Sequence, residues 1–267
     1  MIKGILHVHT VFSHDGKIGI KELRERATKR NISFIILADH AETLLERKNT
    51  GKFFQEMGNY DCPPFVISGI EYPCSPRVHL LAIGIKGIIE NYKDPFHLIE
   101  NTHREDGLVI WAHYDFKLRR EDREILSKVD GVEIWNRKYD GKTSFLPYKG
   151  KVFNKIRNRY NNNLKMYNGA DLHSFSSWSN LFVMMREVSS PAEIMKNLRA
   201  GDFEMVNRYI HISARKFCPS FWEYILMQIT GYFSFLIIRI KNDGYYLWKK
   251  SKIRIPSGVR EVFRRIP

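Results

Sequence analysis

The sequence is poor in cysteine, and its few cysteines form no recognisable pattern. Its 267 residues include only Cys62, Cys74 and Cys218. Because the number is odd and no two stand in a CxxC arrangement, both a disulfide framework and a cysteine-based zinc site are disfavoured. So few cysteines without a pairing pattern are typical of proteins in a reducing compartment.

Two other kinds of signal are missing. The first residues, Met1 to Gly4, run straight into an apolar strand pattern, without the h-region and cleavage site of a secretory signal. The expected location is therefore cytoplasmic. The sequence also contains no GxSxG elbow, no Cys/His pair and no GxxxxGK[ST] loop, so nothing in it indicates a side-chain nucleophile or a P-loop.

Acidic residues are outnumbered, with 29 Asp/Glu against 43 Lys/Arg and a net charge of +14. The excess is uneven, since residues 205–267 hold twelve Lys/Arg and three Asp/Glu and so carry +9 of that charge. Such a segment can meet nucleic acid or an anionic membrane surface, and a merely solvated basic face is the alternative.

Strand-like apolar runs alternate with amphipathic helical patterns along the first 200 or so residues. Strands are expected at Ile2–His7, Phe34–Ala38, Phe65–Ile70, Leu108–Ala112, Gly131–Trp135, Lys165–Ala170 and Leu181–Met185. Helices are expected at Ile20–Arg30, Glu42–Met57, Pro95–Glu105, Glu121–Lys128, Val152–Tyr160 and Pro191–Arg199, the last with Ser190 as N-cap. This order predicts an α/β fold, a distorted (β/α)7 TIM-like barrel over residues 1–204, followed by a basic, aromatic-rich helical extension over 205–267.

The extension contains the nearly apolar stretch "FWEYILMQITGYFSFLIIRI", residues 221–240. Its longest apolar run, Tyr224 to Ile238, is 15 residues, whereas a membrane-spanning helix needs about 20. We expect this stretch to form a helix buried against the barrel. An interfacial helix in peripheral contact with a membrane and a true span are the less favoured alternatives.

Side chains that bind metals follow the ends of the expected strands. They are His7 and His9 on the first, His40 after the second, Glu71 after the third, His113 after the fourth, and Asp171 and His173 after the sixth. In a β/α barrel the carboxyl ends of the strands form the active-site face, so these side chains are expected at one mouth. The i, i+2 spacing of "HVH" and "DLH" predicts that each pair lies on one side of an extended backbone.

Histidines that stand alone in the sequence are weaker candidates for metal ligands. His97, His103 and His211 are expected to be surface or hydrogen-bonded residues. His14, beside Asp15, is expected at the rim of the mouth. At the end of the fifth strand, Glu133, Asn136 and Arg137 are candidates for supporting a ligand or contacting a phosphate, with an Arg137–Asp140 ion pair as the alternative reading of that arginine.

Six segments together resemble the polymerase and histidinol phosphatase (PHP) superfamily of metal-dependent phosphoesterases. They are "HVHTVFSHDG" (7–16), "LADH" (37–40), "SGIE" with "HLLAIG" (68–84), "WAHY" (111–114), "GVEIWN" (131–136) and "GADLHS" (169–174). The sequence departs from the usual pattern at Ile5-Leu6, at Ala38 for threonine and at Tyr114 for proline, and none of these departures removes a ligand.

The resemblance implies a centre of two or three divalent ions held by nine side chains. His7, His9, Glu71 and Asp171 would hold one ion, Glu71, His79 and His113 a second, and Asp15, His40 and His173 a third, with Glu71 bridging the first two. The choice of His79, on an expected hairpin strand Val78–Ile83, rests on the resemblance alone. Glu71, Asp171 and His173 are the expected catalytic residues. Mixed imidazole and carboxylate ligands suit zinc, manganese or iron alike.

Neighbouring divalent ions are suited to phosphate-ester hydrolysis, since they clamp phosphoryl oxygens and lower the pKa of a bound water from about 15.7 toward neutrality. The sequence therefore predicts a phosphoesterase that uses hydroxide and acts on a small phosphomonoester, with Asn136 and Arg137 as candidate substrate contacts. A nuclease of the same type, acting on nucleic acid, is the first alternative. A catalytically silent binding or membrane-docking module is the second.

Overall fold

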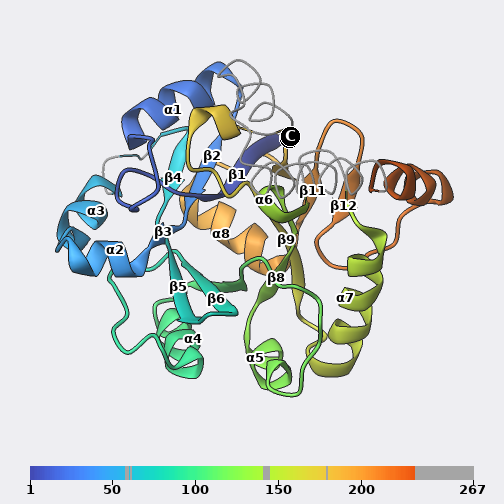
Figure 1. Cartoon of the computed structure of the whole chain (residues 1–267). Helices are drawn as coiled ribbons and strands as arrows, with labels where there is room; N and C mark the ends of the chain where they lie inside the picture. The colour runs from blue at the N-terminus through green and yellow to red at the C-terminus, as the bar shows by residue number, and fades with distance from the viewer. Residues whose placement is uncertain (58–59, 61, 141–144, 179, 232–267) are drawn as a thin grey trace, which may run out of the picture.

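A computed structural model of the chain describes residues 1–57, 60, 62–140, 145–178 and 180–231. Strands occupy its centre and most of the helices lie around them (Figure 1). The elements, in chain order, are β1 (Ile2–Val8), α1 (Ile20–Lys29), β2 (Phe34–Leu37), β3 (Asp39–His40), α2 (Ala41–Glu46), α3 (Thr50–Met57), β4 (Phe65–Ile67), β5 (Gly69–Ser75), β6 (Val78–Ile83), α4 (Pro95–Arg104), β7 (Leu108–Trp111), α5 (Asp122–Lys128), β8 (Gly131–Asn136), α6 (Arg137–Asp140), α7 (Pro147–Tyr160), β9 (Lys165–Gly169), the 3-10 turn η1 (Phe175–Ser177), β10 (Phe182–Met185), α8 (Pro191–Ala200), β11 (Phe203–Val206) and β12 (His211–Ser213).

The strands form two mixed sheets, so the fold is α/β as expected. One has the order β12-β11-β10-β1-β2-β4 and the other β3-β5-β6-β7-β8-β9. Strands β1, β2 and β4 are parallel, as are β7, β8 and β9. Strand β6 is antiparallel to both of its neighbours, which confirms the hairpin expected at Val78–Ile83. Only Ala38 separates β2 from β3, so one run of chain passes from the first sheet to the second.

The sheets also meet at β1. The amide of Ala170, just after β9, donates to the carbonyl oxygen of Leu6 over 2.8 Å, and the amide of His9 donates to the carbonyl oxygen of Leu172 over 2.9 Å. These bonds bring the carboxyl end of β9 beside the carboxyl end of β1.

Two expected elements are divided. The helix expected over Glu42–Met57 is two helices, because the chain turns between α2 and α3 with Lys48 at φ 52°. The strand expected over Phe65–Ile70 is β4 followed by β5, with Ser68 between them donating its hydroxyl to the carbonyl oxygen of Ile85. The expected cap of α8 is present, since the Ser190 hydroxyl accepts from the amide of Glu193.

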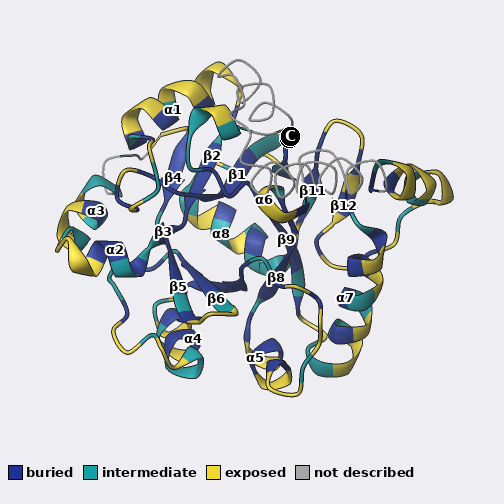
Figure 2. Ribbon diagram, viewed as in Figure 1, coloured by how far each residue is buried: buried dark blue, intermediate teal, exposed yellow. Residues whose placement is uncertain are grey.

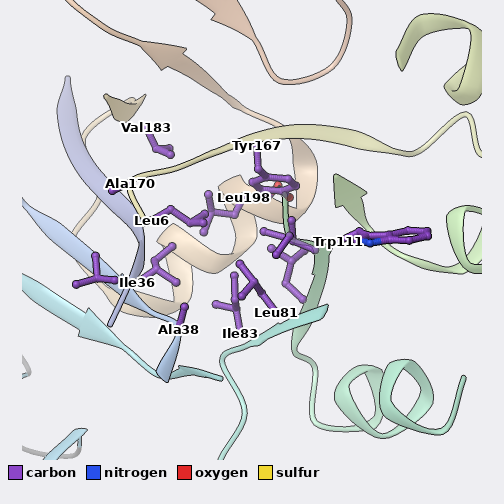
Figure 3. Packing of buried hydrophobic residues seen from close by; sticks show 14 of the residues in the cluster. Leu6, Ile36, Ala38, Leu81, Ile83, Trp111, Tyr167, Ala170, Val183 and Leu198 are labelled. Atoms are coloured by element: carbon purple, nitrogen blue, oxygen red, sulfur yellow. The ribbon is translucent and has the colours of Figure 1, made fainter. Parts of the chain in front are cut away.

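The core lies between the strands and the inner faces of the helices, and exposed residues lie on the outer faces (Figure 2). Figure 3 shows Leu198 of α8 among buried side chains that include Leu6 and Tyr167. The hydroxyl of Tyr167 donates to the carbonyl oxygen of Leu198 over 2.9 Å, which satisfies a polar group in this apolar interior. Helix α8 thereby packs against strands of both sheets.

The expected boundary between residues 204 and 205 falls inside a strand. Strand β11 pairs with β10, and β12 pairs with β11, so residues 203–213 continue the first sheet. A helix then covers residues 221–231, and the remainder of the predicted extension, from residue 232 onward, lies outside the described residues. Among the described residues no helix combines the length and apolar character needed to cross a membrane.

Candidate metal centre

The nine candidate ligands come together at the carboxyl ends of the strands. Three groups have ligand atoms that all lie within 4.8 Å of one another: His9, Asp15, His40 and His173; His7, His9 and Asp171; and His7, Glu71 and His113. The ninth residue, His79, places its Nδ1 2.9 Å from Oε1 of Glu71. The predicted neighbours are therefore adjacent, although the observed groups share His7 and His9 more widely than the resemblance implied.

His7 and His9 aim their free nitrogens at the same point. Nδ1 of His7 donates to Oε1 of Glu133 over 2.8 Å, and the Nε2 atoms of the two histidines lie 3.1 Å apart. The ring of His9 is oriented by Ser13, whose hydroxyl is 3.3 Å from Nδ1. Because the one proton of that hydroxyl goes to Asp39, Ser13 accepts from Nδ1 of His9, which leaves Nε2 as a lone-pair donor. Two nitrogens bound to one tetrahedral zinc ion would lie about 3.4 Å apart.

The i, i+2 argument assumed an extended backbone at "HVH" and "DLH", but the backbone there is not regularly extended. His7 has φ 67°, Asp171 has φ 45° and His113 has φ 35°, all in the left-handed region that non-glycine residues seldom adopt. The register of β1 against β2 also shifts between Leu6 and Val8. The side chains converge as the spacing predicts, and they do so with a left-handed backbone at three of the residues, which the spacing did not predict.

Glu71 is the centre of the cluster. Its Oε1 lies 2.9 Å from Nε2 of His113, and its Oε2 lies 3.4 Å from Nδ1 of His40 and 3.5 Å from Nε2 of His7. Burial alone would raise the pKa of this carboxyl, but hydrogen bonds from His113, His7 and His79 outweigh burial and hold the pKa well below its usual range. Glu71 is therefore a carboxylate with nitrogen atoms on both oxygens, as expected of a bridging ligand.

Asp15 lies on the side of the cluster formed by His40 and His173. Its Oδ2 is 3.0 Å from Nε2 of His173, and its Oδ1 is 3.4 Å from Nε2 of His40. Oδ1 is buried and has no hydrogen-bond partner in the described part of the chain. The Asp15 side chain as a whole is 38% exposed, and a cation beside Oδ1 would supply the partner that this one oxygen lacks.

Sequence reasoning missed Asp39, which is fully buried one residue before His40. Its carboxylate accepts from the amide of Thr10 over 2.8 Å, from the Thr10 hydroxyl over 2.9 Å and from the Ser13 hydroxyl over 2.6 Å. Burial raises the pKa of Asp39 to about 6. Asp39 thus fixes the turn that carries His9 and Asp15, and its position beside His40 in "LADH" was the only signal of this role.

Glu133 and Asn136 support the ligands. Besides binding His7, Glu133 accepts from the amide of His113 over 2.8 Å and from the side-chain amide of Asn136 over 2.8 Å. Asn136 is buried, and its side-chain oxygen accepts from the amide of Lys138. The support expected of these residues is therefore visible, while a contact of Asn136 with substrate stays a prediction.

Arg137 lies at the edge of the cluster on α6. Its Nε is buried without a hydrogen-bond partner among the residues described. Burial lowers the pKa of its guanidinium, and the nearby Asp171 acts in the opposite direction. The alternative partner, Asp140, instead binds the ammonium of Lys149 over 2.6 Å. A second residue of α6 that was not predicted, Tyr139, is exposed and places its ring 5.1 Å from the ring of His113.

Other histidines behave as expected from isolated positions. His14 is exposed at the rim, stacks on His40 at 5.0 Å and lies 3.1 Å from the hydroxyl of Thr43. His103 pairs with Asp130 and His211 pairs with Glu204.

The chain belongs to the PHP domain family, whose model matches residues 6–171. It matches no curated protein. Among solved structures, a two-domain protein from Bacteroides vulgatus containing a predicted PHP-like metal-dependent phosphoesterase shares 18% identity at a TM-score of 0.56, with 79% of this chain and 66% of that chain covered. This likeness shows a shared fold.

Two further solved structures are similar at a lower level. PsfC from Pseudomonas syringae shares 12% identity at a TM-score of 0.48 and covers 86% of this chain and 98% of its own. A protein from Bifidobacterium adolescentis described as a "putative metal-dependent phosphoesterase" shares 17% identity at a TM-score of 0.45, with 73% of this chain and 95% of that chain covered.

Proposed function

We propose that the protein is a metal-dependent phosphoesterase that hydrolyses a small phosphomonoester. The single observation that carries this proposal is the convergence of six histidines and three carboxylates, from separate strands, on one buried cluster. His7, His9, Glu71 and Asp171 would hold one ion, Glu71, His79 and His113 a second, and Asp15, His40 and His173 a third.

The residues present fit divalent ions in three respects. The donor set is imidazole and carboxylate, which suits zinc, manganese or iron. Nε2 of His7 and Nε2 of His9 face each other at 3.1 Å while both Nδ1 atoms are engaged elsewhere. Oδ1 of Asp15 is buried without a donor. The two facing nitrogens converge on one point that either a shared proton or a cation can occupy, and a cation beside Oδ1 of Asp15 would supply the partner that this oxygen lacks.

Bound divalent ions would clamp phosphoryl oxygens and lower the pKa of a water from about 15.7 toward neutrality. The chain's own residues then have defined tasks. Glu133 keeps the proton of His7 on Nδ1, Ser13 keeps that of His9 on Nδ1, and Asp39 fixes Ser13. Glu71, Asp171 and His173 are the proposed catalytic residues, and Oδ1 of Asp171 lies 3.7 Å from Nε2 of His9 and 3.3 Å from Nδ1 of His173.

Arg137 is the proposed contact for the phosphate. Its guanidinium lies near Asp171, is partly desolvated and has an unsatisfied Nε, so an anion arriving beside it would gain a charge-assisted hydrogen bond. Hydrolysis of nucleic acid remains the competing activity.

We also propose that the strands close into the distorted (β/α)7 barrel expected from the sequence. The support is the pair of backbone hydrogen bonds that brings the end of β9 beside β1, together with the run of chain that links β2 to β3.

An activity panel tests the function. Protein loaded separately with manganese, zinc or iron is assayed against small phosphomonoesters, dinucleotides and short oligonucleotides. We expect turnover of phosphomonoesters only, and Arg137→Ala is expected to raise KM while Lys138→Ala, its exposed neighbour, leaves KM unchanged. Turnover confined to oligonucleotides would replace the proposal with a nuclease, and no turnover with any metal would contradict it.

A further inference from the structure

The helix over residues 221–231 has two apolar faces. Met227 and Gly231 are buried, which places one face against the body of the domain. The other face carries Phe221 and Trp222, which are 70% and 77% exposed, and Ile229, which is 51% exposed. Ile225 and Leu226 are exposed between them. Since polar residues normally occupy the solvent face of a surface helix, this face is suited to a second apolar environment.

A stripe of positive charge lies on the neighbouring helix α7. Lys151, Lys155 and Arg159 are exposed and follow one another at intervals of four residues, so they share one side of the helix. Helix α7 contains no acidic residue at all. The stripe therefore presents uncompensated positive charge to solvent.

The two helices form one surface. The ammonium of Lys151 donates to the hydroxyl of Tyr224 over 2.8 Å and lies 4.7 Å from the centre of its ring. Further along α7, the side-chain amide of Asn154 donates to the carbonyl oxygen of Phe217, which precedes the helix, over 2.7 Å. Figure 1 shows the helix of residues 221–231 beyond one end of α7. The apolar face and the basic stripe are thus held beside each other by described contacts.

We propose that this surface docks on an anionic lipid membrane. Trp222, Phe221 and Ile229 would enter the boundary between headgroups and acyl chains, while the stripe on α7 would meet the negative headgroups. Nucleic acid fits less well, because three of the five exposed apolar side chains of this face, Ile225, Leu226 and Ile229, are aliphatic and give bases no ring to stack on. A second copy of this chain fits less well too, because a self-complementary contact would bring two basic stripes together.

The sequence beyond residue 231 has the same sign of charge, with nine Lys/Arg and two Asp/Glu in residues 232–267. This differs from the expectation that the apolar stretch only covers the barrel. In the described part of that stretch, one face does so and the other faces outward.

The experiment uses the full chain and vesicles of two compositions, phosphatidylcholine alone and phosphatidylcholine with about 30% phosphatidylglycerol. At about 0.15 M salt we expect co-sedimentation with the anionic vesicles only, weakening as salt rises. We also expect the fluorescence of Trp222, obtained as the difference between wild type and Trp222→Phe, to shift to shorter wavelength when anionic vesicles are added.

Variants separate this surface from the rest of the chain. Lys155→Gln with Arg159→Gln should weaken vesicle binding by roughly 25-fold, at roughly fivefold for each charge. Trp222→Ala with Ile229→Ala should weaken it on the order of tenfold or more. The matched control is Lys21→Gln with Lys29→Gln on α1, which also removes two exposed charges and should bind as wild type.

Three results would overturn the proposal. The first is wild-type binding by both sets of variants, which would place any lipid contact elsewhere in the chain. The second is equal binding to neutral and anionic vesicles. The third is no vesicle binding together with oligonucleotide binding that Lys155→Gln and Arg159→Gln abolish, which would assign the surface to nucleic acid. All substituted positions are exposed, and thermal unfolding of each variant verifies that the fold is kept.

Discussion

Oε1 of Glu133 lies 2.8 Å from Nδ1 of His7, and both side chains are fully buried. Burial would lower the pKa of His7, but the Glu133 carboxylate, together with Glu71 and Asp171, outweighs burial and holds the pKa well above its usual range. The same carboxylate accepts from the amide of His113, so one residue outside the cluster positions two candidate ligands on different strands.

Glu133→Gln should therefore weaken metal binding without removing a ligand. Glu133 accepts from three donors, and a glutamine offers one oxygen, so at least one donor would face an amide nitrogen. Loss of such a supporting partner lowers metal affinity about 10- to 100-fold. Competition with a chelator measures this change, and Glu124→Gln, an exposed substitution on α5, serves as control. Equal affinities of Glu133→Gln and wild type would contradict the assigned role.

The cluster should hold two or three divalent ions per chain. Nine side chains are gathered there, and three groups of ligand atoms are compact enough to hold an ion. Elemental analysis of protein incubated with manganese or zinc and then desalted gives the number. Less than one ion per chain would count against both the metal centre and the proposed activity.

Glu71→Gln and Asp171→Asn should each abolish hydrolysis while the chain stays folded. Each removes a negative charge from a cluster rich in imidazole, and Glu71 has histidine nitrogen atoms close to both of its oxygens. We expect a loss in kcat/KM greater than about 100-fold, the upper range for residues that only orient a ligand. Asp106→Asn, a surface control, should retain wild-type rates. A variant with bound metal and wild-type turnover would remove that residue from the site.

Metal binding should strengthen as pH rises. The raised pKa of His7 means that its ring is protonated across a range in which a free histidine has lost its proton, and a ligating nitrogen must be free of that proton. Ion binding near neutral pH therefore releases a proton, and affinity falls as acidity increases. Calorimetry in buffers of different ionisation enthalpy counts the protons. Glu133→Gln should release fewer, because the raised pKa depends on Glu133; an unchanged count would contradict this explanation.

Asp39 should add to the free energy of unfolding of the metal-free protein at mildly acidic pH, whereas a carboxyl with a lowered pKa would subtract from it there. Its pKa is raised by burial from 3.8 to about 6, so the protonated form is favoured by folding. This contribution is fully present below the unfolded pKa and is lost as pH rises through the folded one. The whole effect corresponds to about 3 kcal/mol.

Asp39→Asn removes this titration, so the difference in free energy of unfolding between variant and wild type should change between about pH 4 and about pH 6 and be constant outside that window. Chemical denaturation at a series of pH values measures it. A difference that is constant across the window would show that Asp39 is ionised at ordinary acidity in the folded protein.

Several features of the fold and site could be predicted from the sequence alone. The repeated strand–helix order is local, because period-two apolar runs and caps such as Ser190 are properties of neighbouring residues. The position of seven histidines and carboxylates after those runs was enough to place them at one end of the sheets, since the carboxyl ends of parallel strands lie together. The other two candidate ligands, Asp15 and His79, came from the family resemblance.

Only the tertiary structure decided how those ligands are aimed. Alternation along a strand does not predict the left-handed backbone at His7, His113 and Asp171, and the carbonyl oxygen of His7 accepts from the amide of Leu172, which is distant in sequence. The roles of Asp39 and Glu133 likewise depend on donors 20 to 126 residues away along the chain. Burial and long-range hydrogen bonds fix which nitrogen carries a proton, and no local pattern contains that information.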